Sequence, residues 1–483
     1  MREILRKIVL VFFLTLILVP VLLCTVGNLA HKSYLLAFCS SCALALLLWE
    51  NRNLFSRLRS RVNRWNPMVI GVVLSLLCLL INGVFAYLFR PVQAADYRTL
   101  FQVARDLAAG NHPGMKDYVA MFPHILGYSS FLSIFLRAFG PNLSVAVAVN
   151  VILTTVSGFI LFRLLCRMTD LFSASAAFCL WIICPSKLFY NTMSLSEPYY
   201  TCLLLLFLLL ITRVSAALDR GDGNRYLITA ISAALSGLIL TLVQASRPIA
   251  VIPLLALMIW VLLLMHMESL RRTWKGWALF ILITVGCYTA GQSAWKNYAA
   301  QQLEQVPPSL PGYNIYVGFN PETNGSYSDE DMTLFQDRYF GEYERNAEAA
   351  QQSMLEDAKL RITATGSGLP RLMLAKLKTL LGHDEGGVFY AMESLSTRQY
   401  SISCMLSNVW YYLVCILTVF GALRIWRSRE SGSILVVVLF VVGLILAQML
   451  VEVAARYHYS LIPMLLLVSG YGFRQSACSG RTV

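Results

Sequence analysis

Charged residues are scarce in this chain of 483 residues: 13% are Asp, Glu, Lys or Arg, whereas 57% are hydrophobic. Soluble globular domains carry about 25% charged residues, so the composition excludes a water-soluble globule. Apolar runs of membrane-spanning length instead recur from residue 8 to residue 473. Because a spanning helix needs about 20 mainly apolar residues, the sequence predicts an all-α polytopic membrane protein.

Cysteine is missing from the longest polar stretch, 296–402, and nearly all twelve cysteines lie inside apolar runs. This placement excludes a disulfide scaffold. Cys39 and Cys42 form a C-x-x-C motif inside a hydrophobic segment, where small buried side chains are favoured over redox or metal chemistry. The six histidines form no cluster with metal-ligand spacing. The expectation is no cofactor, and a divalent metal ion bound by Asp or Glu alone stays the open alternative.

Twelve apolar segments are predicted to span the membrane. They are 8–26, 34–50, 67–89, 143–165, 171–190, 197–213, 226–244, 248–267, 276–295, 404–425, 432–451 and 456–473. A further apolar stretch, 124–139, is too short to be a good span. We expect it to form a helix that lies at the outer membrane surface.

The net charge of +13 would suggest nucleic acid in a soluble protein, but the basic residues gather in short loops between apolar runs. Such clusters fix orientation in the membrane, so no nucleic-acid partner is predicted. The loop 51–66 holds five arginines and no acid, which places it, and with it both termini, in the cytoplasm. The regions 90–142 and 296–402 are then external, and no P-loop is present for an ATP-driven pump.

The predicted organisation has four parts. Residues 1–66 hold two membrane helices and the basic cytoplasmic loop, and 67–295 form the membrane core with the external loop 90–142. Residues 296–402 form an external polar domain with 14 of the 26 acidic residues, and 403–483 hold the last membrane helices. In the polar domain, Ser328 is predicted to cap a helix that continues to about residue 365, and 371–381 is predicted to be an interfacial helix.

Two acids near the start of that polar helix, Asp329 and Asp331, are spaced like a metal-binding pair in nucleotide-sugar transferases. Acids that complement the dipole of a helix N-terminus are the favoured interpretation.

Ionisable residues at the external ends of spans are functional candidates because they are costly to hold near lipid. Asp96 could accept a proton from an incoming hydroxyl, and its alternative role is an N-cap. Glu197 precedes Pro198 at a helix start, so capping competes with function. Arg247 could bind phosphate or simply extend to the interface. Glu452 and Arg456 are four residues apart and could pair on one helix face.

Several short motifs, in this order and all predicted to be external, resemble the GT-C superfamily of integral-membrane glycosyltransferases. These enzymes use polyprenyl-phosphate sugars and include protein O-mannosyltransferases and lipid A aminoarabinose transferases. The motifs are Ala95-Asp96-Tyr97, Met121 to Tyr128, Pro185-Ser186 through Ser194 to Pro198, Arg247-Pro248, Gly312 to Tyr327, and Arg456-Tyr457-His458. The resemblance covers nearly everything after about residue 67, and the two spans before it look like an N-terminal addition.

The resemblance implies sugar transfer from a polyprenyl-phosphate donor at the outer face of the membrane, with inversion and with Asp96 as the general base. It further implies that seven residues bind donor or acceptor: Lys116, Asp117, His124, Glu197, Arg247, Arg456 and His458. Protein O-mannosyltransferases carry two successive acids at the first site, whereas Tyr97 follows Asp96 here. The expected acceptor is therefore a glycan, a lipid or a cell-envelope polymer, and the expected location is a bacterial plasma membrane.

Two other classes stay open. A polysaccharide polymerase or ligase would also be polytopic, and would depend on arginine and histidine in a late external loop. A secondary transporter or lipid flippase would carry buried charge at mid-membrane and related halves. A non-catalytic membrane scaffold is a further alternative.

Overall fold

The computed structural model describes residues 1–27, 32–221, 223–428 and 432–473, and within these residues every regular element is a helix. In this described part of the chain, eight helices are long and apolar enough to span a membrane. These are α1 (Arg2–Gly27), α2 (Lys32–Glu50), α4 (Pro67–Leu88), α8 (Leu143–Met168), α11 (Glu197–Arg220), α12 (Arg225–Ser246), α14 (Met267–Leu303) and α20 (Thr397–Arg427). The prediction of an all-α polytopic membrane protein is confirmed at this level.

The other four predicted spans form shorter apolar helices. They are α9 (Leu171–Ile182), α13 with the π-helical turn η1 (Val251–Ile259 and Trp260–Leu264), α21 (Ile434–Leu450) and α22 (Leu461–Phe473). The predicted span 171–190 is wrong as one helix, because α9 ends before Pro185 and a separate short helix, α10 (Pro185–Tyr190), begins there. Proline at the first helical position favours this restart. Spanning by all four short helices remains a prediction.

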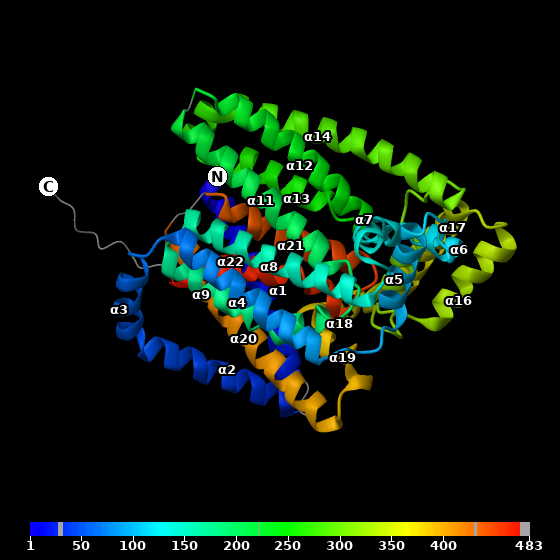
Figure 1. Cartoon of the computed structure of the whole chain (residues 1–483), viewed down its shortest axis with the longest axis horizontal. Helices are drawn as coiled ribbons and strands as arrows, with labels where there is room; N and C mark the ends of the chain where they lie inside the picture. Colours follow the sequence, from blue (N-terminus) through cyan, green and yellow to red (C-terminus); the bar gives the residue numbers. More distant parts are fainter. Residues whose placement is uncertain (28–31, 222, 429–431, 474–483) are drawn as a thin grey trace.

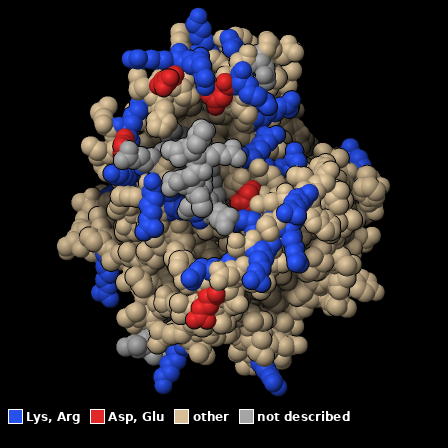
Figure 2. Space-filling view, turned by 90° about the vertical axis from the view of Figure 1, so that its left-hand side faces the viewer, with Lys and Arg blue, Asp and Glu red and all other residues tan. Residues whose placement is uncertain are grey.

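The membrane helices run roughly side by side, and a cluster of shorter helices covers one end of the bundle, at the right in Figure 1. We call this the loop end. Its helices α5 (Ala95–Ala108), α6 (Lys116–Met121), α16 (Asp329–Asp337) and α17 (Ala347–Thr365) come from the two regions predicted to be external. At the opposite end lies α3 (Arg52–Val62), and there Lys and Arg crowd a face with few acids (Figure 2). The side of the membrane that each end faces remains a prediction.

Several remaining elements position the loop end. These are α7 (His124–Phe139), α15 (Gly312–Gly318), η2 (Arg338–Glu342), η3 (Gly366–Gly368), α18 (Leu369–Leu381), α19 (Gly386–Phe389), η4 (Met392–Ser394) and η5 (Ala455–His458).

Helix α14 has 37 residues and is about 55 Å long at 1.5 Å per residue. It exceeds the roughly 30 Å hydrocarbon core of a bilayer, and its last turns contact α6 at the loop end.

Helices α21 and α22 occupy the interior of the bundle, where most of their side chains are buried. Helix α22 packs against α20, α9 and α21, and α8 packs against α4, α9 and α11. The sequences of α21 and α22 are accordingly apolar on every side of the helix, which is typical of a buried helix.

The polar domain differs from its prediction in one place. Ser328 caps α16 by accepting a hydrogen bond from the Asp331 main-chain nitrogen at 3.2 Å, as predicted. The single helix to residue 365 is wrong, because Glu344 and Arg345 adopt positive φ and Asn346 caps a new helix, α17. Helix α18 forms where expected and packs one side against α1, α21 and η5, while Arg371 and Leu374 are exposed, so its interfacial location stays a prediction.

Candidate functional site

An ion pair between α5 and η5 lies at the centre of the candidate site. Arg456 Nη2 donates a hydrogen bond to Asp96 Oδ2, and Arg456 Nε lies 4.0 Å from Glu197 Oε1. Asp96 and Arg456 are 360 residues apart in the chain. The Asp96 side chain is 37% exposed and that of Glu197 only 4%. The carboxylate of Asp96 is therefore the one that a molecule from outside can reach.

The backbone around Asp96 is unusual. Asp96 is in the first turn of α5 and follows Ala95, which has φ 47°. A left-handed conformation costs a non-glycine residue about 1–2 kcal/mol, so the surrounding fold must hold Ala95 in place. The N-cap of α5 is Ala94. The interpretation of Asp96 as an N-cap is therefore wrong, and its carboxylate pairs with Arg456 instead.

Close packing between α7 and α12 brings His124 and Arg247 to the same site. A Cβ atom on Gly127 would lie 2.1 Å from the carbonyl oxygen of Ala245, so this approach requires glycine. Arg247 follows the end of α12, and its Cζ lies 4.0 Å from the ring centroid of Tyr457, a cation–π contact. Within the part of the chain that the structure describes, the Arg247 guanidinium has no hydrogen-bond acceptor and no ion-pair partner.

Three tyrosines surround the Arg456 guanidinium. Its Cζ lies 5.9, 5.8 and 5.6 Å from the ring centroids of Tyr97, Tyr390 and Tyr457. Tyr97 and Tyr390 also contact each other edge to face, with centroids 5.0 Å apart. These rings limit the positions that the guanidinium can occupy, and they give the site aromatic faces of the kind that stack on apolar or cationic groups.

The charges in the site shift several pKa values. Burial would raise the pKa of Asp96, but the Arg456 guanidinium outweighs it and holds that pKa below its ordinary value. Burial raises the pKa of Glu452, against the opposing effect of Arg456. Burial and the nearby Arg247 lower the pKa of His124 to about 4. At neutral pH the site therefore holds an ionised Asp96 and a neutral His124.

Two of the predicted site residues lie elsewhere at the loop end. Lys116, on α6, forms an ion pair with Glu304 at the end of α14. Asp117 accepts a hydrogen bond from the Tyr339 hydroxyl at 3.0 Å. Both side chains hold α6 against neighbouring elements, and no contact joins them to the Asp96–Arg456 pair among the described residues.

His458 is also placed differently from its prediction. It is 1% exposed and, among the described residues, does not contact Asp96 or Arg247. Its ring contacts the Leu380 carbonyl oxygen and the Asp384 carboxyl group instead. The expected pairing of Glu452 with Arg456 on one helix face is wrong, because residues 451–454 are not helical and Arg456 pairs with Asp96. No sequence pattern pointed to Asp384, since it lies in a polar loop 74 residues before its partner His458.

One member of the acidic pair in the polar domain, Asp331, has a structural role. Asp331 accepts hydrogen bonds from Arg361 Nη1 and Nη2 and from Asn320 Nδ2, each at 2.9 Å. In the described residues no group of three or more His, Cys, Asp and Glu side chains could hold a metal ion. A divalent ion bound by Asp or Glu stays a prediction.

The fold and this site define the chain as an all-helical membrane protein with a charged, aromatic-lined site at the loop end of its bundle. No protein-family model and no curated protein matches the chain. The resemblance to the GT-C enzymes therefore depends on the motifs alone.

Proposed function

We propose that this protein transfers a sugar from a polyprenyl-phosphate-linked donor to an acceptor at the outer face of the membrane. The observation that carries the proposal is the Arg247 guanidinium, which has no protein acceptor among the described residues and contacts the same Tyr457 ring as the Arg456 guanidinium. Arginine suits phosphate because its planar fork donates paired hydrogen bonds. Two arginines at the ends of membrane helices fit a phosphate that is anchored in the bilayer.

The proposed reaction is a single displacement at the anomeric carbon of the donor. Asp96 takes the proton of the acceptor hydroxyl as the acceptor oxygen bonds to that carbon. The bond between the carbon and the phosphate oxygen breaks at the same time, and the lipid phosphate leaves with the electron pair. Attack and departure on opposite sides invert the configuration. Arg247 and Arg456 stabilise the charge that develops on the phosphate.

The low pKa of Asp96 in the isolated protein is compatible with this role. Its carboxylate is ionised because it forms an ion pair with the Arg456 guanidinium. A phosphate that also engages Arg456 would weaken this pairing, and the pKa of Asp96 would then rise towards its ordinary value. The donor would therefore make Asp96 a stronger base. The acceptor expected from the motifs is a glycan, a lipid or a cell-envelope polymer.

The experiment is transfer of labelled sugar from a panel of polyprenyl-phosphate donors, with the purified protein in lipid nanodiscs. Asp96→Asn and Asp96→Ala are compared with Asp106→Asn, a variant on the same helix whose carboxylate contacts only the Gly114 main-chain nitrogen among the described residues. We expect turnover in the wild type and in Asp106→Asn, and none in either Asp96 variant. Turnover that survives Asp96→Ala would remove Asp96 as the base.

The same assay separates the alternative classes. Asp96 and Arg456 join the first and the last of the loops predicted to be external, so dependence on either residue does not distinguish a single transfer from polymerisation. Product length does: a glycosyltransferase adds one sugar, and a polymerase extends a chain. Folded protein that turns over no donor, yet moves the labelled lipid between leaflets, would support the flippase.

A further inference from the structure

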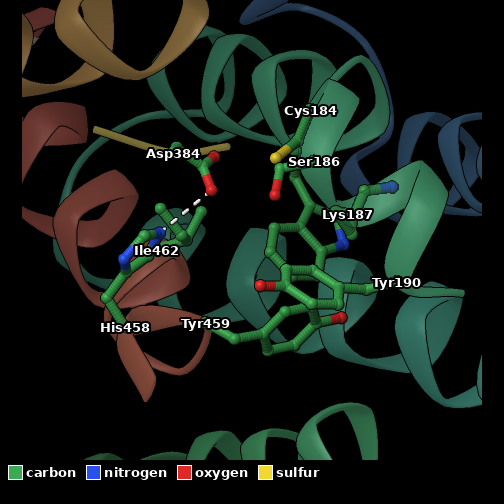
Figure 3. A pocket seen from close by; sticks show the side chains of 9 residues that line it. Cys184, Ser186, Lys187, Tyr190, Asp384, His458, Tyr459 and Ile462 are labelled. Atoms are coloured by element: carbon green, nitrogen blue, oxygen red, sulfur yellow. Dashed lines mark hydrogen bonds and ion pairs between the residues drawn. The ribbon is translucent and has the colours of Figure 1, made fainter. Parts of the chain in front are cut away.

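A second cluster of polar side chains is buried behind the site. His458 and Asp384 are each 1% exposed, and a dashed line in Figure 3 marks their contact. His458 Nε2 lies 3.0 Å from Asp384 Oδ1, and Nδ1 lies 2.7 Å from the carbonyl oxygen of Leu380. The ring of Tyr411 stacks on His458 with centroids 5.5 Å apart. Each nitrogen of the His458 ring therefore faces an oxygen.

These contacts decide where the protons of the pair lie. A carbonyl oxygen only accepts hydrogen bonds, so His458 Nδ1 carries a hydrogen. His458 Nε2 and the Asp384 carboxyl then share one more proton, either as imidazolium with carboxylate or as neutral imidazole with carboxylic acid. In both forms the ring is held at both nitrogens. The orientation of His458 is therefore fixed by Leu380 and Asp384.

A small cavity adjoins the pair. Four buried oxygens that line it have no hydrogen-bond partner among the described residues: Asp384 Oδ2, Ser186 Oγ, Tyr190 Oη and Tyr459 Oη. Figure 3 shows these side chains around one space. The space available to the centre of a water molecule is about 10 Å³. A polar cavity of roughly this size holds one water molecule, and buried polar atoms are normally hydrogen-bonded.

Two of the three segments that meet at the cavity lead directly to the candidate site. His458 ends η5, two residues after Arg456, and Asp384 precedes α19, which leads to Tyr390. A Cβ on Gly386 would lie 2.3 Å from Tyr190 Oη, and one on Gly387 would lie 2.3 Å from the Ser186 carbonyl oxygen. The α19 backbone is therefore pressed against α10.

We propose that His458, Asp384 and one water molecule bound in this cavity form a buried anchor that positions Arg456 and Tyr390. His458 holds η5, Asp384 holds the start of α19, and the water joins both to Ser186 of α10. The importance of this anchor for sugar transfer rests on the proposed function. The coupling of the two segments does not, because it follows from the contacts alone.

The test is hydrogen–deuterium exchange of the full-length protein in nanodiscs, followed by mass spectrometry. Asp384→Leu leaves His458 Nε2 without a partner and leaves the water with fewer acceptors. We expect exchange in 384–391 and in 453–460 to become about tenfold faster together. This change corresponds to about 1.4 kcal/mol of local opening free energy.

Two further variants serve as matched comparisons. Asp384→Asn keeps the shape and can donate to neutral His458, so we expect wild-type exchange in both segments. Asp170→Asn also removes a carboxylate, but Asp170 caps α9 beside Arg59 at the opposite end of the bundle. It should leave both segments unchanged. If Asp384→Leu does not fold, His458→Gln takes its place. This variant keeps one hydrogen-bond donor but loses the second contact. We expect it to speed exchange in 384–391, a segment that does not carry the substitution.

Two results would overturn the anchor. One is faster exchange confined to the segment that carries the substitution. The other is exchange that is equal in wild type and in Asp384→Leu. Binding of a polyprenyl phosphate is measured on the same samples, and we expect it to weaken about tenfold in Asp384→Leu and to be retained in Asp384→Asn. A wild-type protein that binds no polyprenyl phosphate would refute the proposed function and leave the exchange result standing.

Discussion

Lys376 Nζ donates a hydrogen bond to the main-chain carbonyl of Val451 at 2.7 Å. The same ammonium also donates to the carbonyl oxygens of Gly318 at 2.7 Å and Met449 at 2.8 Å, and the side chain is fully buried. It thus joins the polar domain to the loop that leads to Arg456. A Cβ on Gly318 would lie 2.4 Å from the main-chain carbon of Val451, so the two loops touch at this point.

Replacing Lys376 by methionine should destabilise the protein strongly. The substitution keeps most of the apolar stem but leaves three carbonyl oxygens without their donor, and an unsatisfied buried group costs about 1–3 kcal/mol. We expect a lower unfolding temperature in scanning fluorimetry. Lys378→Met, two residues further on the same helix, is the control, because Lys378 has no side-chain hydrogen bond among the described residues. Equal unfolding temperatures for the two variants would contradict the assigned role of Lys376.

Substitutions of the two arginines of the site should differ in their effect on stability but should both weaken phosphate binding. Arg456→Met leaves the carboxylates of Asp96 and Glu197 without their cation. We expect the free energy of unfolding to fall by about 2 kcal/mol. Arg247→Met removes only the cation–π contact with Tyr457 and no protein hydrogen bond among the described contacts, so the unfolding temperature should fall less than in Arg456→Met. Both variants should bind a polyprenyl phosphate at least about tenfold more weakly, the effect of losing one charged hydrogen bond. Unchanged binding in Arg247→Met would refute its role as a phosphate ligand.

Sequence reasoning found the membrane helices because long apolar runs report burial in lipid directly. It selected Asp96, Glu197, Arg247 and Arg456 as candidates because charge at the end of a span is costly, and the structure brings these four near one another. It did not predict that Lys116 and Asp117 pair with Glu304, after α14, and with Tyr339 on η2.

What the sequence could not supply was the set of contacts between distant segments. The Asp384–His458 pair and the burial of Lys376 depend on how α18 and α19 pack against η5. No spacing within one segment encodes this packing. An amphipathic helix such as α18 has the same sequence pattern on a membrane surface and against other helices, so its pattern did not predict that one side packs against α1, α21 and η5.

His124 should make the stability depend on pH. Its pKa is about 4 in the folded protein, because burial and Arg247 disfavour the charged ring, against an ordinary value of 6.5. Between these two values the unfolded chain binds more protons than the folded one, so stability rises with pH. We expect the unfolding temperature of the wild type, relative to His124→Gln, to fall as pH is lowered from 6.5 to 4. His112→Gln, at an exposed histidine of the same region, should keep the wild-type slope; a slope unchanged in His124→Gln would contradict the assignment.

Gly127→Ala tests whether the contact of α7 with α12 sets the distance between His124 and Arg247. The new Cβ would lie 2.1 Å from the Ala245 carbonyl oxygen, and backbone cannot move aside without shifting a helix. Overpacking of this kind costs about 1–3 kcal/mol. We therefore expect a lower unfolding temperature and weaker binding of a polyprenyl phosphate.

Gly83→Ala is the matched control for this substitution, because Gly83 is on α4 and a Cβ there meets nothing within 4 Å. The same change in helix propensity should then leave stability equal or slightly raised. If the separation of α7 from α12 matters for the site, the pH dependence due to His124 should also weaken in Gly127→Ala, since Arg247 would lie further from the ring. A Gly127→Ala variant with wild-type stability and wild-type binding would show that α7 can move without disturbing Arg247.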